Sequence, residues 1–144
     1  MVRCGFSASN LLITMLSQLL MHPRLRFACL GGAALIYLGI IVGGNIPGAR
    51  ADIGEFAPGV VLHSCAYAVL TVLCFLGSTG SAGARAVKAV LAIALMGAGD
   101  EFIQSFFPYR GADVRDWAVD CTAAILVSLL LCIVLPKTAL ASKR

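Results

Sequence analysis

Charged residues are scarce in this sequence. They make up 12% of its 144 residues, about half the share found in a typical soluble domain, whereas 60% of the residues are apolar. The mean hydropathy is +0.94. These values exclude a soluble globular domain, a disordered chain, a collagen and a coiled coil. They predict a small integral membrane protein with one compact domain.

Basic clusters are also missing. The net charge is +4, from eleven Lys and Arg against seven Asp and Glu. No basic run reaches five residues and none alternates with aromatic residues, so we expect no nucleic-acid partner. The seven acids all lie between Asp52 and Asp120, and the basic residues near them in the sequence are Arg50, Arg110 and Arg115.

The common catalytic and metal-binding signatures are absent as well. The sequence has no C-x-x-C pair, no H-E-x-x-H, no P-loop and no Ser-His-Asp arrangement. The cysteines are therefore predicted to be small apolar packing residues, with a Cys65–Cys121 bridge left as an alternative. The six are Cys4, Cys29, Cys65, Cys74, Cys121 and Cys132.

Long apolar stretches are what the sequence does contain. A bilayer core takes about 20 apolar residues of helix. Four stretches fit, and Gly- and Pro-rich connections separate them. They run over 27–44, 60–77, 87–107 and 117–135. The predicted fold class is therefore all-α: an integral membrane bundle of four transmembrane helices over 23–136.

The two ends of the chain differ from this domain. Residues 1–22 carry a stripe of leucine and methionine, which predicts an N-terminal amphipathic segment lying in the membrane interface. A signal peptide is one alternative, although no small-x-small cleavage site precedes Arg24, and a later start at Met15 or Met21 is another. Residues 137–144 are predicted to be a basic cytoplasmic tail.

The distribution of basic residues predicts the orientation. Lys and Arg in short loops stay on the cytoplasmic side. The N-terminal flank, the 78–88 region and the C-terminal tail hold eight of the eleven basic residues and no acid. Both termini are therefore expected to be cytoplasmic, and the 45–59 and 108–116 loops to face outward.

This topology places the ionisable residues of three helices in one layer near the outer surface. At 3.6 residues per turn, Asp100 and Gln104 share a face, as do Asp116 and Asp120, and His63 and Tyr67. A charge at the centre of a spanning helix costs about 2.5–3.5 kcal/mol, so such residues mark functional sites by default. We expect them to converge on a common outward-facing pocket.

Roles in this pocket can be assigned as hypotheses. The candidate catalytic residues are His63, Asp100, Glu101 and Asp116, and the candidate substrate-binding residues are Tyr67, Gln104, Arg110 and Asp120. Three of the carboxylates, on Asp100, Glu101 and Asp116, are candidate ligands for a divalent cation. Oxygen ligands of this kind suit Mg, Ca or Mn rather than zinc.

Structural explanations compete with these roles. Asp113 is better explained as a helix N-cap than as a functional residue. Asp116 and Asp120 are as consistent with solvation of a helix end as with a site. His63 is equally consistent with a satisfied buried histidine, and Arg110 with a snorkelling side chain or an anion clamp.

The polar residues also resemble a known pattern. The run from Asp100 to Asp120 resembles the D-E-x-x-Q…P-x-R…D-x-x-x-N/D pattern of VanZ-like membrane proteins, and the stretch from His63 to Leu70 resembles their H-x-x-x-Y-x-x-L motif. The resemblance covers residues 27–135. It implies that Glu101, Gln104, Arg110 and Asp116 are the motif residues here.

What the resemblance implies is a family and a compartment. The family consists of small multispanning bacterial envelope proteins and takes its name from a role in resistance to the glycopeptide teicoplanin. It implies the bacterial cytoplasmic membrane rather than one reaction. Asp120 stands where Asn is frequent, which adds a negative charge to this pocket. Ala123 stands where Gly is commoner.

Three functions are compatible with the sequence. The first is an envelope protein whose pocket binds a lipid-linked or cell-wall component, or affects glycopeptide susceptibility. The second is an intramembrane, metal-dependent hydrolase or transferase acting on an anionic lipid-linked substrate. The third is a proton- or cation-coupled transporter, which with four spans would require a homo-oligomer.

Overall fold

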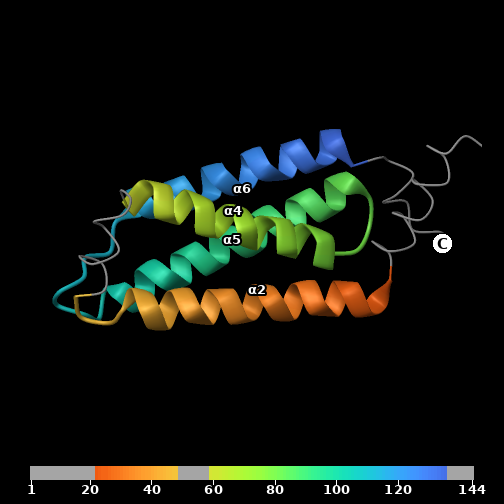
Figure 1. The fold of residues 1–144 in the computed structure, drawn as a ribbon. Coiled ribbons are helices and arrows are strands. Elements are labelled where there is room, and N and C mark those ends of the chain that lie inside the picture. The colour runs from red at the N-terminus through yellow and green to blue at the C-terminus, as the bar shows by residue number, and fades with distance from the viewer. Residues whose placement is uncertain (1–21, 49–58, 136–144) are drawn as a thin grey trace, which may run out of the picture.

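The structure is a computed structural model and describes residues 22–48 and 59–135. Over these ranges the chain forms four α-helices and no strand, so the all-helical prediction is confirmed. The helices are α2 (Pro23–Gly44), α4 (Gly59–Gly77), α5 (Ala82–Gln104) and α6 (Val114–Val134) (Figure 1). The predicted interfacial segment, apart from His22, and the predicted basic tail lie outside the described residues.

Capping residues, rather than hydropathy alone, set where the helices begin. α2 begins at Pro23 rather than at residue 27, because proline is favoured in the first turn. α5 begins after Ser81, whose hydroxyl accepts a hydrogen bond from the Ala84 N–H at 3.3 Å. α6 begins after Asp113, whose carboxylate accepts from the Arg115 N–H at 2.8 Å. The predicted N-cap role of Asp113 is confirmed.

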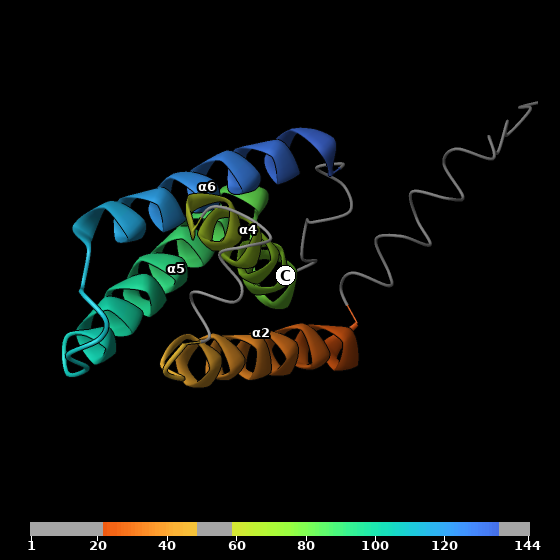
Figure 2. The same cartoon turned by 60° about the vertical axis from the view of Figure 1, so that its left-hand side comes forward.

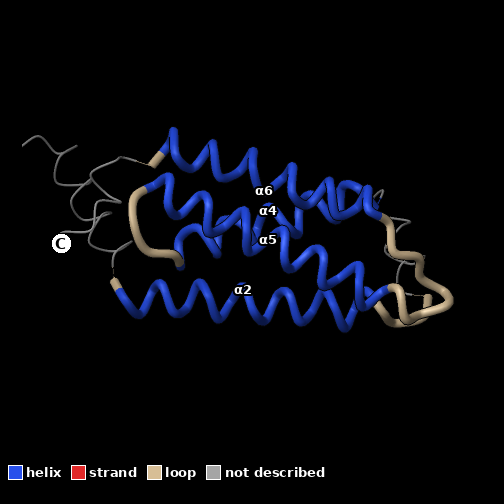
Figure 3. The backbone as a smooth tube through the Cα atoms, turned by 180° about the vertical axis from the view of Figure 1, so that it is seen from behind, coloured by secondary structure: helices blue, strands red, loops and turns tan. Residues whose placement is uncertain are grey.

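The helices alternate in direction along the chain. The end of α2, the start of α4, the end of α5 and the start of α6 lie at one end of the bundle, which we call the polar end. The 78–81 connection, the start of α2 and the end of α6 lie at the opposite end (Figures 1 and 3). This alternation brings segments that are far apart in the sequence to the same level.

α4 lies at the centre of the packing. It packs against α2, α5 and α6, and α5 and α6 also pack closely on each other, whereas α2 touches α5 only slightly. Figure 2 shows α2 set apart from the α5–α6 pair. The core is formed mainly by α4 and α5, with Leu70, Phe75 and Ile93 fully buried. The molecule is thus a tight three-helix unit with α2 docked on α4.

The outer surface of the bundle is apolar. Large hydrophobic side chains point outward on every helix, and Ile133 is 82% exposed. Three helices, α2, α4 and α6, are long and apolar enough to cross a membrane. α5 is not among these three, although its 23 residues make a helix about 35 Å long, enough for a core of about 30 Å. That α5 crosses the membrane stays a prediction.

Candidate functional site

One face of α5 is buried along its whole length. Its buried positions repeat about every four residues, as one helical face requires: Arg85, Ala89, Ile93, Gly97, Asp100, Glu101 and Gln104. The middle of this stripe is apolar. Its last turn, at the polar end of the bundle, consists of two carboxylates and an amide, and only 1% of Asp100 is exposed.

His63 connects this region to α6. Its Nδ1 lies 3.2 Å from Asp120 Oδ1, and its Nε2 lies 3.9 Å from Asp116 Oδ2. Asp116 and Asp120 are one turn apart on α6, so the imidazole of α4 faces both carboxylates. Asp120 is fully buried, while the side chains of His63 and Asp116 keep 17% and 14% of their surface exposed. Solvent or a ligand can therefore reach the pair at His63.

Tyr67 connects α4 to α5. It lies one turn after His63 on the same face, and the two rings stack with centroids 6.0 Å apart and an interplanar angle of 6°. Its hydroxyl is 3.5 Å from Asp100 Oδ2, a long contact for a hydroxyl donor. His63 and Tyr67 thus contact carboxylates on two different helices.

Glu101 fixes the connection between α5 and α6. Its Oε2 accepts a hydrogen bond from the Asp113 backbone N–H at 2.6 Å, directly at the N-cap of α6. One carboxylate oxygen therefore holds the start of the helix that carries Asp116 and Asp120. Glu101 has a positioning role that its place in the sequence did not reveal.

Several buried polar atoms of this cluster have no hydrogen-bond partner. Three are carboxylate oxygens, and one is the amide nitrogen of Gln104. The oxygens are Asp100 Oδ1, Glu101 Oε1 and Asp120 Oδ2. A buried polar group without a partner costs about 1–3 kcal/mol. The Arg110 Nε, at the same end of the bundle, is also buried without a partner, so the unpartnered atoms include donors as well as acceptors.

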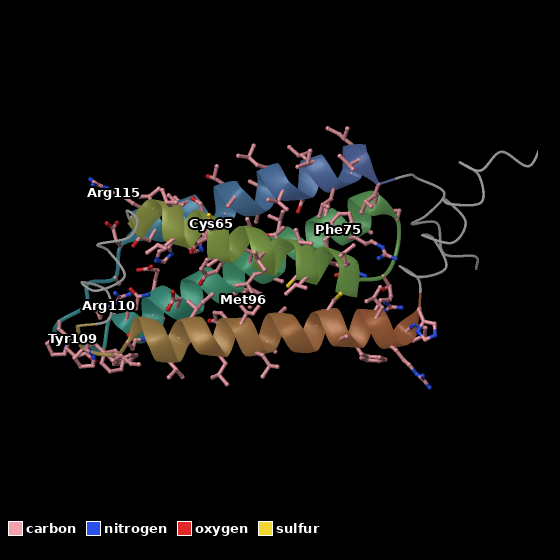
Figure 4. All side chains as sticks on the ribbon, viewed as in Figure 1. Cys65, Phe75, Met96, Tyr109, Arg110 and Arg115 are labelled. Atoms are coloured by element: carbon pink, nitrogen blue, oxygen red, sulfur yellow. The ribbon has the colours of Figure 1, made fainter. Side chains whose placement is uncertain are left out.

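Arg110 and Arg115 lie beside the cluster rather than within it. Arg115 is exposed at the start of α6. Arg110 lies at the end of α2, where its Nη2 is 3.8 Å from the position that a Cβ on Gly44 would take. Figure 4 shows both arginines at the polar end of the bundle. Among the described residues, no ion pair joins Arg110 to Asp100, Glu101 or Asp120.

An apolar groove opens next to the cluster, between α2 and α4. Its volume is about 390 Å³, and its lining is Ile36, Gly39, Ile40, Gly43, Gly44, Leu62, His63, Ala66 and Tyr67. His63 and Tyr67 are thus shared by the groove and the carboxylate cluster. A Cβ added at Gly39 or Gly43 would meet no atom within 4 Å, because both glycines face open space.

The groove was not predicted from the sequence. A signal for it exists: Gly39 and Gly43 lie four residues apart, a spacing that puts two small residues on one face of a transmembrane helix. Trp117 and Gly97 were also missed. The Trp117 indole N–H donates to the Ala94 carbonyl at 2.9 Å, and the absent Gly97 side chain leaves room for Trp117 and Asp120.

The three predicted metal ligands, Asp100, Glu101 and Asp116, stay a prediction. Within residues 22–48 and 59–135, no three His, Cys, Asp or Glu side chains are grouped closely enough to hold a metal ion. Asp100, Glu101 and Asp116 belong to one region but do not converge on one point.

The cysteines of the described segments are all free. Cys29 and Cys74 are buried, as small apolar packing residues are expected to be, whereas Cys65 is exposed on α4 (Figure 4). Cys121 is half-buried and also free, so the alternative of a Cys65–Cys121 bridge is not realised.

Comparison with known proteins identifies the family. The profile of the VanZ/LLP1 family matches residues 56–135, which include α4, α5 and α6 and therefore the whole carboxylate cluster. α2, which forms the other wall of the groove, precedes the matched region. No curated protein and no solved structure matches the chain significantly. Because the match extends over more than half of the sequence, the chain belongs to the VanZ/LLP1 family.

Proposed function

We propose that this protein binds a lipid-linked component of the bacterial cell envelope, with the hydrocarbon chain in the groove and the head group against the carboxylate cluster. One observation carries the proposal: His63 and Tyr67 line an apolar groove and at the same time contact Asp120 and Asp100. An apolar groove with polar groups beside it matches an amphiphile, which combines a hydrocarbon chain with a polar head group.

The dimensions and composition of the groove support this function. Ligand pockets typically measure about 300–1,000 Å³ and combine apolar walls with a few placed polar groups. The groove has about 390 Å³, and only two of its nine lining residues, His63 and Tyr67, carry polar side chains. Its glycines remove side chains where a hydrocarbon chain would lie against α2.

The charge distribution supports an outward-facing site in the cytoplasmic membrane. Arg24, Arg26, Arg85 and Lys88 lie at the end opposite the carboxylates, and short basic segments stay cytoplasmic. In this orientation the polar end faces the outer leaflet and both termini are cytoplasmic. Altered glycopeptide susceptibility is the phenotype expected if the bound component belongs to the cell wall.

Binding is favoured over catalysis and transport by the same geometry. The cluster offers no grouped metal ligands among the described residues, and the hydrolase alternative depends on such a metal. The carboxylates are concentrated at one end of α5 and α6, whereas the middle of the buried α5 stripe is apolar. A coupled transporter would require polar groups that continue across the bundle.

Photolabelling in a bilayer tests the proposal. The full chain is placed in phosphatidylcholine nanodiscs with dodecyl glucoside that carries a diazirine at the end of its chain, and the labelled peptides are mapped. We expect saturable labelling of the groove segments 36–44 and 62–67. Gly39→Leu, which fills the groove, should abolish this labelling.

Gly31→Leu is the matched control. Gly31 lies on the same helix, has no atom within 4 Å of an added Cβ, and does not line the groove. This variant should label like the parent. Labelling that rises without saturation and is equal on all exposed apolar faces would mean that the groove is ordinary lipid-facing surface, and the proposal would be wrong.

A further inference from the structure

We infer that a basic patch at the end of the bundle opposite the carboxylates binds the phosphodiester head group of an anionic lipid. The patch consists of Arg26 on α2 together with Arg85 and Lys88 on α5, gathered around the turn that joins α4 to α5 (Figure 1). Because it lies far from the groove and the carboxylate cluster, this inference goes beyond the proposed function and does not depend on it.

Two accessible cations from different helices meet at this turn. The Arg26 Nε donates to the Gly77 carbonyl at 3.4 Å. The Lys88 Nζ donates to the Thr79 carbonyl at 3.0 Å and to the Thr79 hydroxyl at 3.4 Å. Arg26 is half-buried and Lys88 is exposed, so a ligand can touch both. The start of α2 and the start of α5 are thus held to neighbouring residues of one turn.

Arg85 adds a third positive charge from the interior. It is fully buried and donates to the Gly80 and Leu76 carbonyls, on either side of the residues that Arg26 and Lys88 contact. A ligand does not touch this side chain, but its charge adds to the positive potential at the surface beside it. The patch therefore combines one buried charge with two accessible ones.

No acidic side chain of the protein can balance these charges. Five of the seven acids lie within 100–120, at the polar end. The other two, Asp52 and Glu55, are four residues from Gly48 and from Gly59, respectively, and both glycines lie at the polar end. Four residues reach at most about 14 Å, less than half the length of α5. An anion at the basic patch therefore comes from outside the chain.

The surroundings of the patch favour a lipid as the source of this anion. An exposed leucine follows each accessible cation by about one helical turn: Leu30 follows Arg26, and Leu91 follows Lys88. An anion joined to hydrocarbon chains can contact the cations and these apolar side chains together. Lys and Arg beside the ends of spanning helices attract anionic lipids, and a guanidinium suits the oxygens of a phosphate. Phosphatidylcholine carries its own cation, so a lipid with net negative charge fits better.

Competition between two lipids tests the inference. The full chain in dodecyl maltoside is mixed with equal concentrations of dioctanoyl phosphatidylglycerol and dioctanoyl phosphatidylcholine, and native mass spectrometry compares the two bound forms. Each basic residue near the head group contributes about fivefold in affinity. We therefore expect phosphatidylglycerol to bind at least about tenfold more tightly than phosphatidylcholine.

Charge-removing variants locate the binding. Arg26→Gln and Lys88→Gln should each weaken phosphatidylglycerol about fivefold and leave phosphatidylcholine within about twofold. Arg26→Lys, which keeps the charge, should retain the preference. Arg24→Gln is the matched control, because Arg24 lies at the same helix end but about 200° around α2 from Arg26. It should stay within about twofold of the parent. Unchanged helical circular dichroism shows that each variant is folded.

Three outcomes would overturn the inference. Equal binding of the two lipids by the parent would mean that the patch does not select negative charge. Equal losses in Arg24→Gln and Arg26→Gln would mean diffuse attraction to a charged helix end rather than a site. Displacement of phosphatidylglycerol by an equal concentration of inorganic phosphate would identify a soluble phosphate as the ligand. Each of these outcomes leaves the proposed function standing, because the groove is tested separately by photolabelling.

Discussion

A carboxylate that is buried among membrane helices has to be compensated by its neighbours. For Asp120 this compensation is half complete. Its Oδ1 lies 3.2 Å from His63 Nδ1, while its Oδ2 is buried without a partner against Gly97. Removing the charge while keeping the accepting oxygen should relieve the burial cost and preserve the contact with the imidazole.

Asp120→Asn is therefore expected to leave the free energy of unfolding unchanged or to raise it. Asp120→Ala, which removes the His63 partner as well, should lower it by about 1–3 kcal/mol. Thermal unfolding in detergent, followed by circular dichroism, measures both. If the two variants were equally destabilised, the charge itself would be holding the bundle together.

Gly97 is the second residue whose chemistry can be tested alone. A Cβ there would lie 3.1 Å from Asp120 Oδ2 and 3.1 Å from Trp117 Cδ1. Neither neighbour can yield easily, because Trp117 is held by its bond to Ala94 and Asp120 by His63. Overpacking of this kind costs about 1–3 kcal/mol, more than the helix propensity gained.

We therefore expect Gly97→Ala to lower the unfolding midpoint and to shift the fluorescence of Trp117. Gly83→Ala is the matched control on the same helix, since a Cβ there meets no atom within 4 Å. It should be neutral or stabilising by up to about 1 kcal/mol. A neutral Gly97→Ala would show that Trp117 and Asp120 move apart at little cost.

At the scale of elements, the turn between α4 and α5 depends on one buried arginine. Arg85 donates from Nε to the Gly80 carbonyl at 3.0 Å and from Nη1 to the Leu76 carbonyl at 3.4 Å. A helix leaves its last carbonyls without partners, and a cation at that end also interacts favourably with the helix dipole. Arg85 thus satisfies the end of α4 and fixes the start of α5.

Arg85→Met should lower the free energy of unfolding by about 2–4 kcal/mol, because two carbonyls lose a charged donor. Lys88→Met is the comparison: Lys88 is exposed and donates to the Thr79 carbonyl at 3.0 Å, so its loss should cost less than about 1 kcal/mol. Thermal unfolding of both variants in the same detergent measures the two losses of stability. Equal losses would mean that the burial of Arg85 contributes nothing.

Local sequence features predicted that all four helices exist but did not predict all of their first residues. Apolar runs of about 20 residues located all four, and the Asp113 cap was recognised from its position before an apolar run. The starts of α2, α5 and α6 were placed too late, because the charged residues Arg24, Arg85 and Arg115 were assigned to loops. In α5 the first turn is helical because Ser81 caps it and because Arg85 finds buried acceptors.

At the scale of the whole molecule, the sequence located the polar cluster better than it located the groove. Helical spacing places Asp100 with Gln104 and His63 with Tyr67, and alternating helix directions bring them to one level. The groove depends on how α2 lies against α4, and this follows from side-chain packing at Gly39 and Gly43. Which carboxylate oxygens are buried without a partner likewise follows only from the packed side chains, because helical spacing does not fix side-chain contacts between helices.

The orientation in the membrane is the last property to test, and two exposed positions at opposite ends of the bundle allow it. In a cysteine-free background, Gly111→Cys probes the polar end and Thr79→Cys the α4–α5 turn. The positive-inside rule predicts that an impermeant maleimide labels position 111 in intact cells and position 79 only after permeabilisation. The opposite pattern would turn the carboxylates toward the cytoplasm. It would leave the bundle and the groove unchanged and would require the amphiphile to enter from the inner leaflet.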